Sequence, residues 1–301
     1  MPVPARRLPV PSIESAFVVF DAQDSGCLSY GVEEAGRRWL VKTATTAEGR
    51  ASLDRACAVH AAVRHPAIVG PTWTVPGEAG PTLIYPWYDG SLLNHATVHG
   101  TDRAGLTRFQ RLPVPQVEEA LDAILDAHLA VSAAGLVAVD LYDGCFLYDF
   151  SAGRMRLIDL DEYRPGPFVL DADRLPGSRS YMAPEELVRG ALIDERTTVH
   201  LLGRTLHHLL DSAQGWRGNG DQRRVVDRAT ESAPATRYPN VPALVRAWRL
   251  AAGGWRLAAG GWRLAAGGWW LAARGSRLAA GGSRHPDSTS AGRARPAGRP
   301  A

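Results

Sequence analysis

The chain has 301 residues, of which 45% are hydrophobic and 22% charged, so it can form one large folded domain or two small ones. The net charge of +3 is unevenly distributed, because residues 251–301 hold eight arginines and one aspartate, and residues 1–250 therefore hold 26 basic and 30 acidic side chains. A mildly acidic folded part has no electrostatic footprint for nucleic acid. No stretch has 18 or more uncharged apolar residues, and we expect no membrane span.

The three cysteines, Cys27, Cys57 and Cys145, are odd in number and widely spaced. This spacing is typical of a reduced cytoplasmic protein rather than of a disulfide-linked scaffold. Residues 1–12 are rich in proline, and no apolar run follows their arginines, so we expect neither a signal peptide nor a regular element there. The composition thus indicates a cytoplasmic protein with an irregular start.

The first third of the chain is rich in strand signals. Residues 13–47 contain three β-like runs, AFVVF, CLSYGV and RRWLVK, separated by the turn-forming stretches DAQDSG and EEAG. Between Ala51 and Val63, small or apolar residues recur at helical spacing, which predicts a helix. TLIYPWYDG, residues 82–90, predicts a further strand. Residues 94–115 are polar and contain two prolines, and we expect a surface connection there.

The remainder is richer in helix signals. Residues 116–134 place apolar side chains three and four positions apart, which predicts an amphipathic helix. LVAV, CFLYDF and MRLIDL predict three short strands, the last two joined by a hairpin turn at SAGR. Helices are expected around VHLLGRTLHHLL and VPALVRAWRL. Strands first and helices later are the pattern of an α+β protein with two unequal lobes and a cleft between them.

Residues 251–301 continue a repeat that starts within the last predicted helix. The unit WRLAAGG recurs from Trp248, Trp255 and Trp262 with a period of seven and then degenerates. Each unit carries two glycines, which cost a helix about 2 kcal/mol per repeat relative to alanine. Composition therefore favours a disordered tail over a coiled coil. The alternative is an interaction tail whose arginines and tryptophans contact acidic surfaces.

RRWLVKTATT, residues 37–46, contains Lys42, the single lysine of the chain, whereas the other 33 basic residues are arginines. Arginine can replace lysine wherever only positive charge matters, but not where a compact ammonium group must fit a tight site. A phosphate-binding lysine is such a site. The alternative is a solvated lysine at the end of a strand.

Two aspartates stand in apolar surroundings that require a reason for their charge. Asp140 lies in the run VAVDL, and Asp159 follows RLI nineteen residues later. The triplet A-P-E then occupies residues 183–185. The order of lysine strand, helix, Asp loop, hairpin, Asp and A-P-E resembles the signature set of protein kinases.

The resemblance covers residues 13–250 and is closest to divergent bacterial serine/threonine-kinase-like proteins. RHPAIV resembles the linker after the first kinase helix, and RTTVHLLGRTL resembles a later core helix. Arg237 stands where the kinase arginine pairs with the glutamate of A-P-E, here Glu185. The resemblance implies an α+β, bilobal protein-kinase-like fold, with a small strand-rich N-lobe over residues 13–90 and a helical C-lobe over residues 91–250.

The resemblance also implies a nucleotide site for ATP. Lys42 would bind the α- and β-phosphates, and Asp140 would accept or orient the proton of the substrate hydroxyl. The remaining residues of the implied nucleotide site are Gly26, Tyr85 and Trp87.

The implied metal is Mg²⁺, which Asp159 would bind together with the β- and γ-phosphates. The asparagine that binds a second Mg²⁺ in kinases aligns with Cys145, and a thiolate is a poor ligand for this ion. Asp143 or Asp161 is expected to substitute as a metal ligand. The implied partner is a protein or peptide substrate.

Other positions depart from the kinase pattern. The glutamate that pairs with the lysine aligns with Ala56, which leaves Asp54 or Asp159 as the expected partner of Lys42. Gly26 is the one glycine that matches the glycine-rich loop. The aspartate that braces the catalytic loop aligns with Thr198, whose hydroxyl would brace it more weakly.

Three functions remain open on these residues. The first is an atypical kinase that transfers the γ-phosphate of ATP to a serine or threonine hydroxyl, for which the retained Lys42, Asp140 and Asp159 speak. The second is a pseudokinase that binds nucleotide or partners without transfer, as the lost glycines and glutamate suggest. The third is a small-molecule phosphotransferase, suggested by IDLDEY but opposed by A-P-E and Arg237.

The kinase triplet H-R-D is AVD here, at residues 138–140, so the arginine that binds a phosphorylated activation segment is absent. We therefore predict that activity does not require phosphorylation between Asp159 and Ala183. Replacing both Ser178 and Ser180 by alanine should leave the rate of phosphate transfer unchanged. A large loss of activity in that double variant would contradict this prediction.

Overall fold

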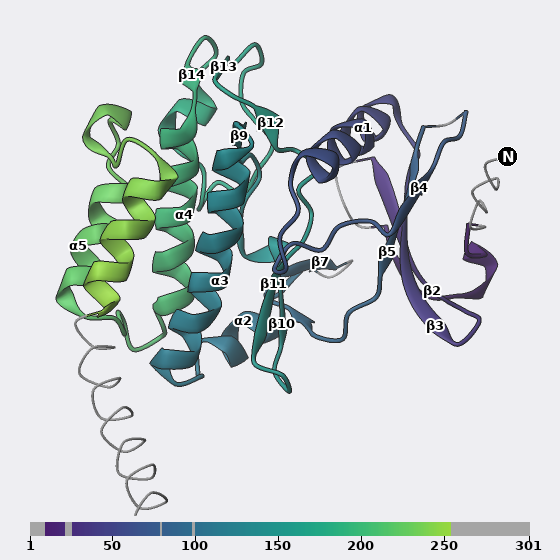
Figure 1. Ribbon diagram of the computed structural model, residues 1–301, viewed down its shortest axis with the longest axis horizontal. Coiled ribbons are helices and arrows are strands. Elements are labelled where there is room, and N and C mark those ends of the chain that lie inside the picture. The colour runs from purple at the N-terminus through teal and green to yellow at the C-terminus, as the bar shows by residue number, and fades with distance from the viewer. Residues whose placement is uncertain (1–9, 22–25, 79, 98–99, 254–301) are drawn as a thin grey trace, which may run out of the picture. The chain divides into compact units, whose positions relative to one another are not determined.

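The computed structural model describes residues 10–21, 26–78, 80–97 and 100–253. Contacts divide the chain into the units Met1–Ala252 and Gly253–Ala301. The first unit is mixed α+β, with a strand-rich N-terminal part and a helical C-terminal part (Figure 1). Of the predicted disordered tail, only residues 251–253 are described, and they are helical; the rest lies outside the described residues.

A five-stranded antiparallel sheet forms the N-terminal part, with the strand order β1-β2-β3-β5-β4. A short 3-10 helix, η1 Ile13–Ser15, precedes it. The strands are β1 Ala16–Phe20, β2 Cys27–Glu34, β3 Arg37–Ala44, β4 Trp73–Val75 and β5 Thr82–Pro86. The strands predicted from AFVVF, CLSYGV, RRWLVK and TLIYPWYDG are therefore confirmed. Lys42 lies in the central strand, opposite Ser29 of β2 and Leu83 of β5.

Helix α1 (Ala47–Ala62) packs against β3 and β5 on one face of the sheet (Figure 1). It begins four residues before the predicted start, because the Thr46 hydroxyl accepts a hydrogen bond from the Gly49 N–H at 3.1 Å and caps the first turn. Its buried residues Leu53 and Ala56 join a cluster with Leu83 and Tyr85 of β5. Burial of this face holds α1 beside the strand that carries Lys42.

RHPAIV, residues 64–69, joins the N-terminal part to a hairpin of the C-terminal part. The hairpin consists of β10 Phe146–Asp149 and β11 Arg154–Leu157, and its turn is the predicted SAGR. The Leu157 N–H donates to the Ala67 carbonyl at 2.7 Å, and the Val69 N–H donates to the Leu157 carbonyl at 2.9 Å. These two backbone bonds attach the end of β11, from which the segment of Asp159 and Asp161 continues, to the loop that follows α1.

The predicted surface connection over residues 94–115 is wrong in its second half. The segment contains the hairpin β7 His95–Thr97 and β8 Gly100–Asp102, followed by helix α2 Ala104–Phe109. Leu106 and Phe109 are buried in the C-terminal core, and Phe109 packs edge-on against Tyr148 with ring centroids 4.9 Å apart. Two apolar residues at helical spacing within a polar stretch are enough to anchor this helix.

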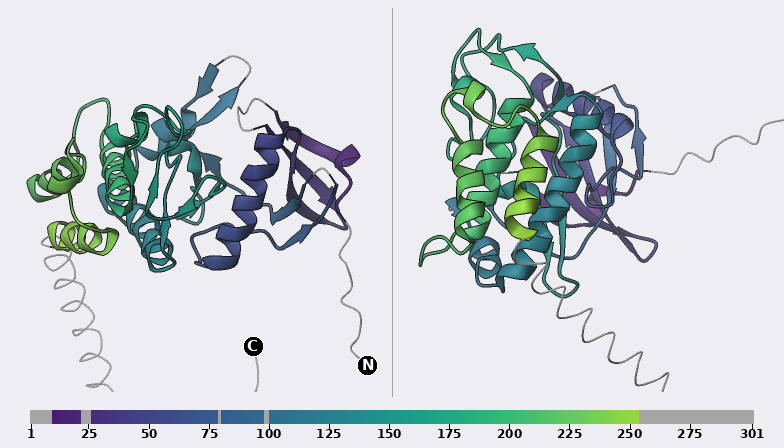
Figure 2. Two further views of the ribbon diagram at one scale, coloured as in Figure 1. Left: turned by 90° about the horizontal axis from the view of Figure 1, so that it is seen from above. Right: turned by 60° about the vertical axis from the view of Figure 1, so that its left-hand side comes forward.

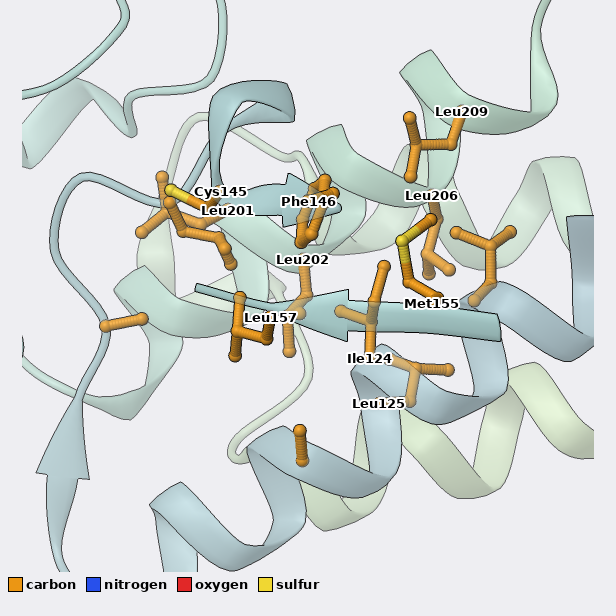
Figure 3. Packing of buried hydrophobic residues seen from close by; sticks show 14 of the residues in the cluster. Ile124, Leu125, Cys145, Phe146, Met155, Leu157, Leu201, Leu202, Leu206 and Leu209 are labelled. Atoms are coloured by element: carbon orange, nitrogen blue, oxygen red, sulfur yellow. The ribbon is translucent and has the colours of Figure 1, made fainter. Parts of the chain in front are cut away.

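Four longer helices build the C-terminal part: α3 Val114–Ala133, α4 Glu195–Leu210, α5 Gly220–Ala229 and a last helix over residues 241–253. The helices α3, α4 and α5 lie side by side (Figure 1, Figure 2). The apolar faces of α3 and α4 close on the hairpin, where Ile124, Phe146, Leu157 and Leu202 are buried together (Figure 3). Helix α5 packs against α4. The helices predicted over residues 116–134 and around the two later motifs are confirmed.

Short elements complete the C-terminal part and carry its loops. Strand β6 pairs with β10, β9 pairs with β12, and β13 pairs with β14. These strands are β6 Ser91–Leu92, β9 Leu136–Val137, β12 Arg164–Pro165, β13 Phe168–Val169 and β14 Leu192–Ile193. The 3-10 helices are η2 Asp143–Cys145, η3 Pro184–Leu187 and η4 Pro234–Thr236. Strand β9 matters most here, because it leads directly into the loop of Asp140.

Two expectations about the whole chain can be compared with the described part. No disulfide joins Cys27, Cys57 and Cys145, all of which the structure describes. Among the described residues, none of the helices combines the length and the apolar character that crossing a bilayer requires.

The predicted pair of Glu185 and Arg237 forms a buried ion pair. Arg237 donates to both carboxylate oxygens of Glu185, at 2.6 and 2.9 Å, and the two side chains are 0% and 8% exposed. Thr197 of α4 donates a further hydrogen bond to Glu185 at 2.9 Å. Because the charges are paired and hydrogen-bonded, this cluster joins η3, α4 and η4 without leaving an unpaired ion in the core.

Replacing Arg237 by alanine should lower the free energy of unfolding by about 3–5 kcal/mol, because it leaves the Glu185 carboxylate buried without its partner. Urea denaturation followed by circular dichroism measures this loss. The matched control is Arg249→Ala, which removes an arginine that is 42% exposed and pairs with Asp122 and Asp126. The control should cost about 1 kcal/mol or less. Equal losses in the two variants would contradict the structural role of the buried pair.

Candidate active site

Lys42 and the segment after β11 meet in a buried ion-pair cluster. The Lys42 ammonium donates to Asp159 Oδ1 at 2.7 Å and makes a closer contact with Asp161 Oδ2. The side chain of Lys42 is 9% exposed, that of Asp161 is 6% and that of Asp159 is 36%. Lys42 is therefore not a solvated strand-end lysine. Asp159 is confirmed as its partner, whereas no ion pair in the described part joins the exposed Asp54 to it.

The three charges shift one another's protonation. Burial disfavours the charged form of Lys42, but Asp159 and Asp161 outweigh burial and raise the pKa of its ammonium well above the usual value. Burial likewise opposes ionisation of Asp159, yet Lys42 holds the pKa of that carboxyl below its ordinary value. Burial raises the pKa of Asp161 to about 6. At neutral pH the cluster therefore holds one ammonium group between two carboxylates.

A cavity of about 220 Å³ adjoins this cluster. The charged residues Lys42, Asp159 and Asp161 lie in its wall, as do the predicted nucleotide-site residues Tyr85 and Trp87. The other lining residues are mainly apolar and include Phe20, Leu40, Val69, Leu92, Leu147 and Ile158. An apolar cavity with a few convergent charges is the usual form of a small-molecule site.

Gly26 does not line this cavity. It has a φ of +67°, and its carbonyl accepts hydrogen bonds from the N–H and the hydroxyl of Thr45 at 2.9 and 3.0 Å. A Cβ atom at this position would overlap the side chain of Thr46, which caps α1. The structure thus gives Gly26 a local role, since only glycine fits where β2 approaches the start of α1. The preceding loop, residues 22–25, lies outside the described residues.

Asp140 lies in the loop that follows β9. It has a φ of +59° and Asp159 a φ of +60°, and they are two of three described residues other than glycine with positive φ. Burial raises the pKa of Asp140 to about 7, and the negative charges of Asp159 and Glu162 add to this effect. Strained backbone and a shifted carboxyl pKa at the same residue are typical of functional sites.

The loop of Asp140 is braced from α4, as the sequence predicts. The hydroxyl oxygen of Thr198 accepts a hydrogen bond from the Ala138 N–H at 3.0 Å, and both residues are buried. The Cys145 thiol donates to the Asp140 carbonyl at 3.2 Å from the other side. These two bonds hold the backbone of the loop and leave the Asp140 carboxyl for other contacts.

The candidate metal ligands differ in their surroundings. Asp143 is buried, accepts a hydrogen bond from the Asn94 amide at 2.8 Å and lies 3.8 Å from Arg103. Burial raises the pKa of the Cys145 thiol, which therefore stays neutral and is a poor ligand for Mg²⁺. In the part of the chain that the structure describes, no three His, Cys, Asp or Glu side chains are grouped as a metal site. The half-exposed Asp159 is the carboxylate that best fits a hard cation.

Helix α1 is attached to the same segment by contacts that the sequence analysis missed. Arg55 of α1 pairs with Glu162, and its Nε donates to the Asp161 carbonyl at 3.2 Å. Ser52, one turn earlier, donates to Glu162 Oε1 at 3.0 Å. Three carboxylates within DLDE and an arginine on the predicted helix were visible in the sequence, but more than 100 residues separate them.

A larger cavity of about 790 Å³ lies between the end of α1, the loop over residues 63–72 and β4. It is lined by His60, His65 and Trp73 among others, and no carboxylate and none of the predicted site residues lines it. Size alone would favour this cavity. We assign the site to the smaller one, because the paired ammonium and carboxylates lie there.

Comparisons of the chain with models of protein families and with curated proteins found no match. Function is therefore inferred from the residues and their geometry.

Asp140→Asn should stabilise the folded protein at high pH. The folded state binds the Asp140 proton more tightly than the unfolded chain, whose aspartates titrate near pH 4, so the parent loses stability as pH rises from about 4 to about 7. Asparagine lacks this penalty and tolerates positive φ. The gain should approach an upper limit of about 4 kcal/mol at pH 8 and shrink toward zero near pH 4.

Urea denaturation of parent and variant at about pH 5 and about pH 8 measures this difference. Asp173→Asn is the matched control, because the side chain of Asp173 is 93% exposed. A gain that is the same at both pH values, or that also occurs in the control, would show that Asp140 is not held in its protonated form.

Proposed function

We propose that the chain is an atypical protein kinase with a bilobal kinase-like fold, which transfers the γ-phosphate of ATP to a serine or threonine hydroxyl. The observation that carries this proposal is the ion pair of Lys42 and Asp159 in the wall of an apolar cavity. The two residues come from β3 and from the loop after β11, 117 residues apart. The kinase resemblance assigns this pair to the phosphates and to the metal.

Different residues of the cavity suit different parts of a bound nucleotide. Its volume of about 220 Å³ is below the ~300–1,000 Å³ of a typical small-molecule site, so it would enclose only part of the nucleotide. The side chains of Tyr85, Trp87 and Leu147 suit a planar base. Lys42 would then bind phosphate oxygens, and Asp159 would hold Mg²⁺, which supplies charge neutralisation when bound.

Asp140 would act on the substrate hydroxyl. The hydroxyl oxygen forms a bond with the γ-phosphorus, the bond to the leaving ADP oxygen breaks, and the hydroxyl proton passes to the Asp140 carboxylate. A carboxyl pKa of about 7 suits a group that gains and loses a proton near neutral pH. The braced loop of Asp140 supports catalysis by positioning, which is the main contribution that proteins make to phosphate transfer.

A pseudokinase is the second candidate, and the contact between Lys42 and Asp161 favours it. Asp161 occupies one side of the ammonium group, and Cys145 stands as a neutral thiol where kinases have a metal-binding amide. A small-molecule phosphotransferase is third, because the buried pair of Glu185 and Arg237 supports a kinase-type surface for a peptide substrate.

Transfer of the γ-phosphate from Mg-ATP to a serine- and threonine-rich protein substrate tests the proposal. The parent should transfer phosphate, and Asp140→Ala should lower the rate by about 10²–10⁴-fold, the usual contribution of a positioned acid or base. Lys42→Met should weaken ATP binding and transfer. Asp173→Asn, at an exposed position, is the control that should keep the parental rate.

The outcomes separate the candidates. Transfer that is lost in both variants and kept in the control supports a kinase. An ATP-induced rise in the melting temperature without transfer supports the pseudokinase. If ATP does not raise the melting temperature and no phosphate is transferred, both nucleotide-dependent functions are overturned.

A further inference from the structure

In the described part of the chain, no carboxylate of helix α1 pairs with Lys42. Ala56 occupies the buried face of α1 that packs against β5, whereas Glu48 and Asp54 of this helix are exposed and neither forms an ion pair with Lys42. An ammonium group that is 9% exposed nevertheless requires a nearby negative charge, because burying it unpaired is very costly. Another element must therefore supply the buried counter-ion of Lys42.

Asp161 is placed to supply this charge. Its side chain is the more buried of the two carboxylates, at 6% exposed, and it makes the closer contact with the Lys42 ammonium. Asp159 is 36% exposed and contacts the same ammonium at 2.7 Å. Both carboxylates line the cavity, but Asp159 has the larger exposed fraction and is therefore the more accessible to a further ligand.

The ion pair between α1 and this segment also shows that the segment, and not the helix, supplies the carboxylates. Here the helix provides a cation, Arg55, and the segment provides a carboxylate, Glu162, whose Oε1 also accepts from Ser52. Arg55 Nε in addition donates to the carbonyl of Asp161 at 3.2 Å. The segment over residues 159–162 therefore carries the carboxylates that pair with Lys42 of β3 and with Arg55 of α1.

We infer that Asp161 is a positioning residue for Lys42 rather than a metal ligand, and that Glu162 attaches α1 independently. Lys42 is then held by the segment after β11 and needs no side chain from α1, so the phosphate-binding lysine stays in place whatever the helix does. The inference rests on the proposed function only in that it assigns phosphate binding to Lys42; the contacts themselves do not depend on it.

The single lysine makes the inference measurable. Acetic anhydride labels Lys42 and the α-amino group alone among the amines of the full chain, so mass spectrometry of the peptide that contains Lys42 gives its acylation rate. Without nucleotide, Asp161→Asn should raise this rate at least about tenfold at fixed pH, because a lost counter-ion worth about 1.4 kcal/mol or more releases the free amine. Asp161→Glu, which keeps the charge, should label more slowly than Asp161→Asn.

Asp54→Asn is the matched control, since Asp54 is an exposed carboxylate on α1. It should label at the parental rate. If Asp161→Asn labels as slowly as this control while circular dichroism shows a folded chain, Asp161 is not the counter-ion and the inference is overturned.

The variant Glu162→Gln tests the inference without replacing Asp161. Hydrogen exchange of the α1 amides should become faster, because the helix loses one attachment. Acylation of Lys42 should rise far less than in Asp161→Asn, because Asp159 and Asp161 still contact the ammonium group. A rise as large as that of Asp161→Asn would show that the lysine depends on α1, and would overturn the inference.

Mg-ATP separates this inference from the proposed function. Nucleotide should protect Lys42 of the parent from acylation if its ammonium binds phosphate. Absence of protection would contradict the proposed nucleotide site, whereas the comparison of variants without nucleotide would still decide the role of Asp161.

Discussion

Burying the ammonium group of Lys42 requires negative charge beside it, and the neighbouring elements are arranged around that requirement. Two carboxylates of one short segment contact the ammonium, and both come from the turn after β11. The same segment binds α1 through Glu162, so it joins the strand of Lys42 and the helix by separate contacts. Loss of the segment's geometry would leave the Lys42 ammonium, whose side chain is 9% exposed, without its paired charges.

Backbone bonds make this arrangement possible. The loop after α1 forms two backbone hydrogen bonds with Leu157, one through the Ala67 carbonyl and one through the Val69 N–H. The residues that follow Leu157 therefore start from a fixed position. The hydrophobic cluster around the hairpin holds β11 from the other side (Figure 3). Apolar packing thus positions the backbone. The pairing of Lys42 with Asp159 and Asp161 then depends on the side chains that this backbone carries.

The sequence predicted the elements well where the signal was local. The amphipathic helix near residues 116–134, the SAGR hairpin and the strand of Lys42 each have a periodicity or a turn that a few neighbouring residues define. Helix α2 was missed because its two buried residues stand within polar neighbours. Its burial is set by Tyr148 and other residues distant in sequence.

The candidate site could be predicted in its residue types, but less so in the pairings of its side chains. An unusual lysine and two aspartates in apolar runs pointed to Lys42, Asp140 and Asp159 without structure. The contact of Asp161 with Lys42 spans 119 residues, and sequence spacing cannot tell whether a carboxylate will face an ammonium or a metal. Gly26 is a similar case. The sequence pattern suggested a nucleotide-site glycine, but the structure shows that a side chain there would overlap Thr46 at the start of α1.

The positive φ angles of Asp140 and Asp159 have a consequence for how such a sequence can drift. Backbone in this region costs an ordinary residue on the order of 1 kcal/mol or more, and glycine and asparagine are the residues that relieve it. At both positions the substitutions that would relax the chain are also those that delete a charge. A lineage that no longer used these carboxylates would find mutations to glycine or asparagine there favourable for folding. Under the proposed function, its loss would therefore favour glycine or asparagine at these two positions.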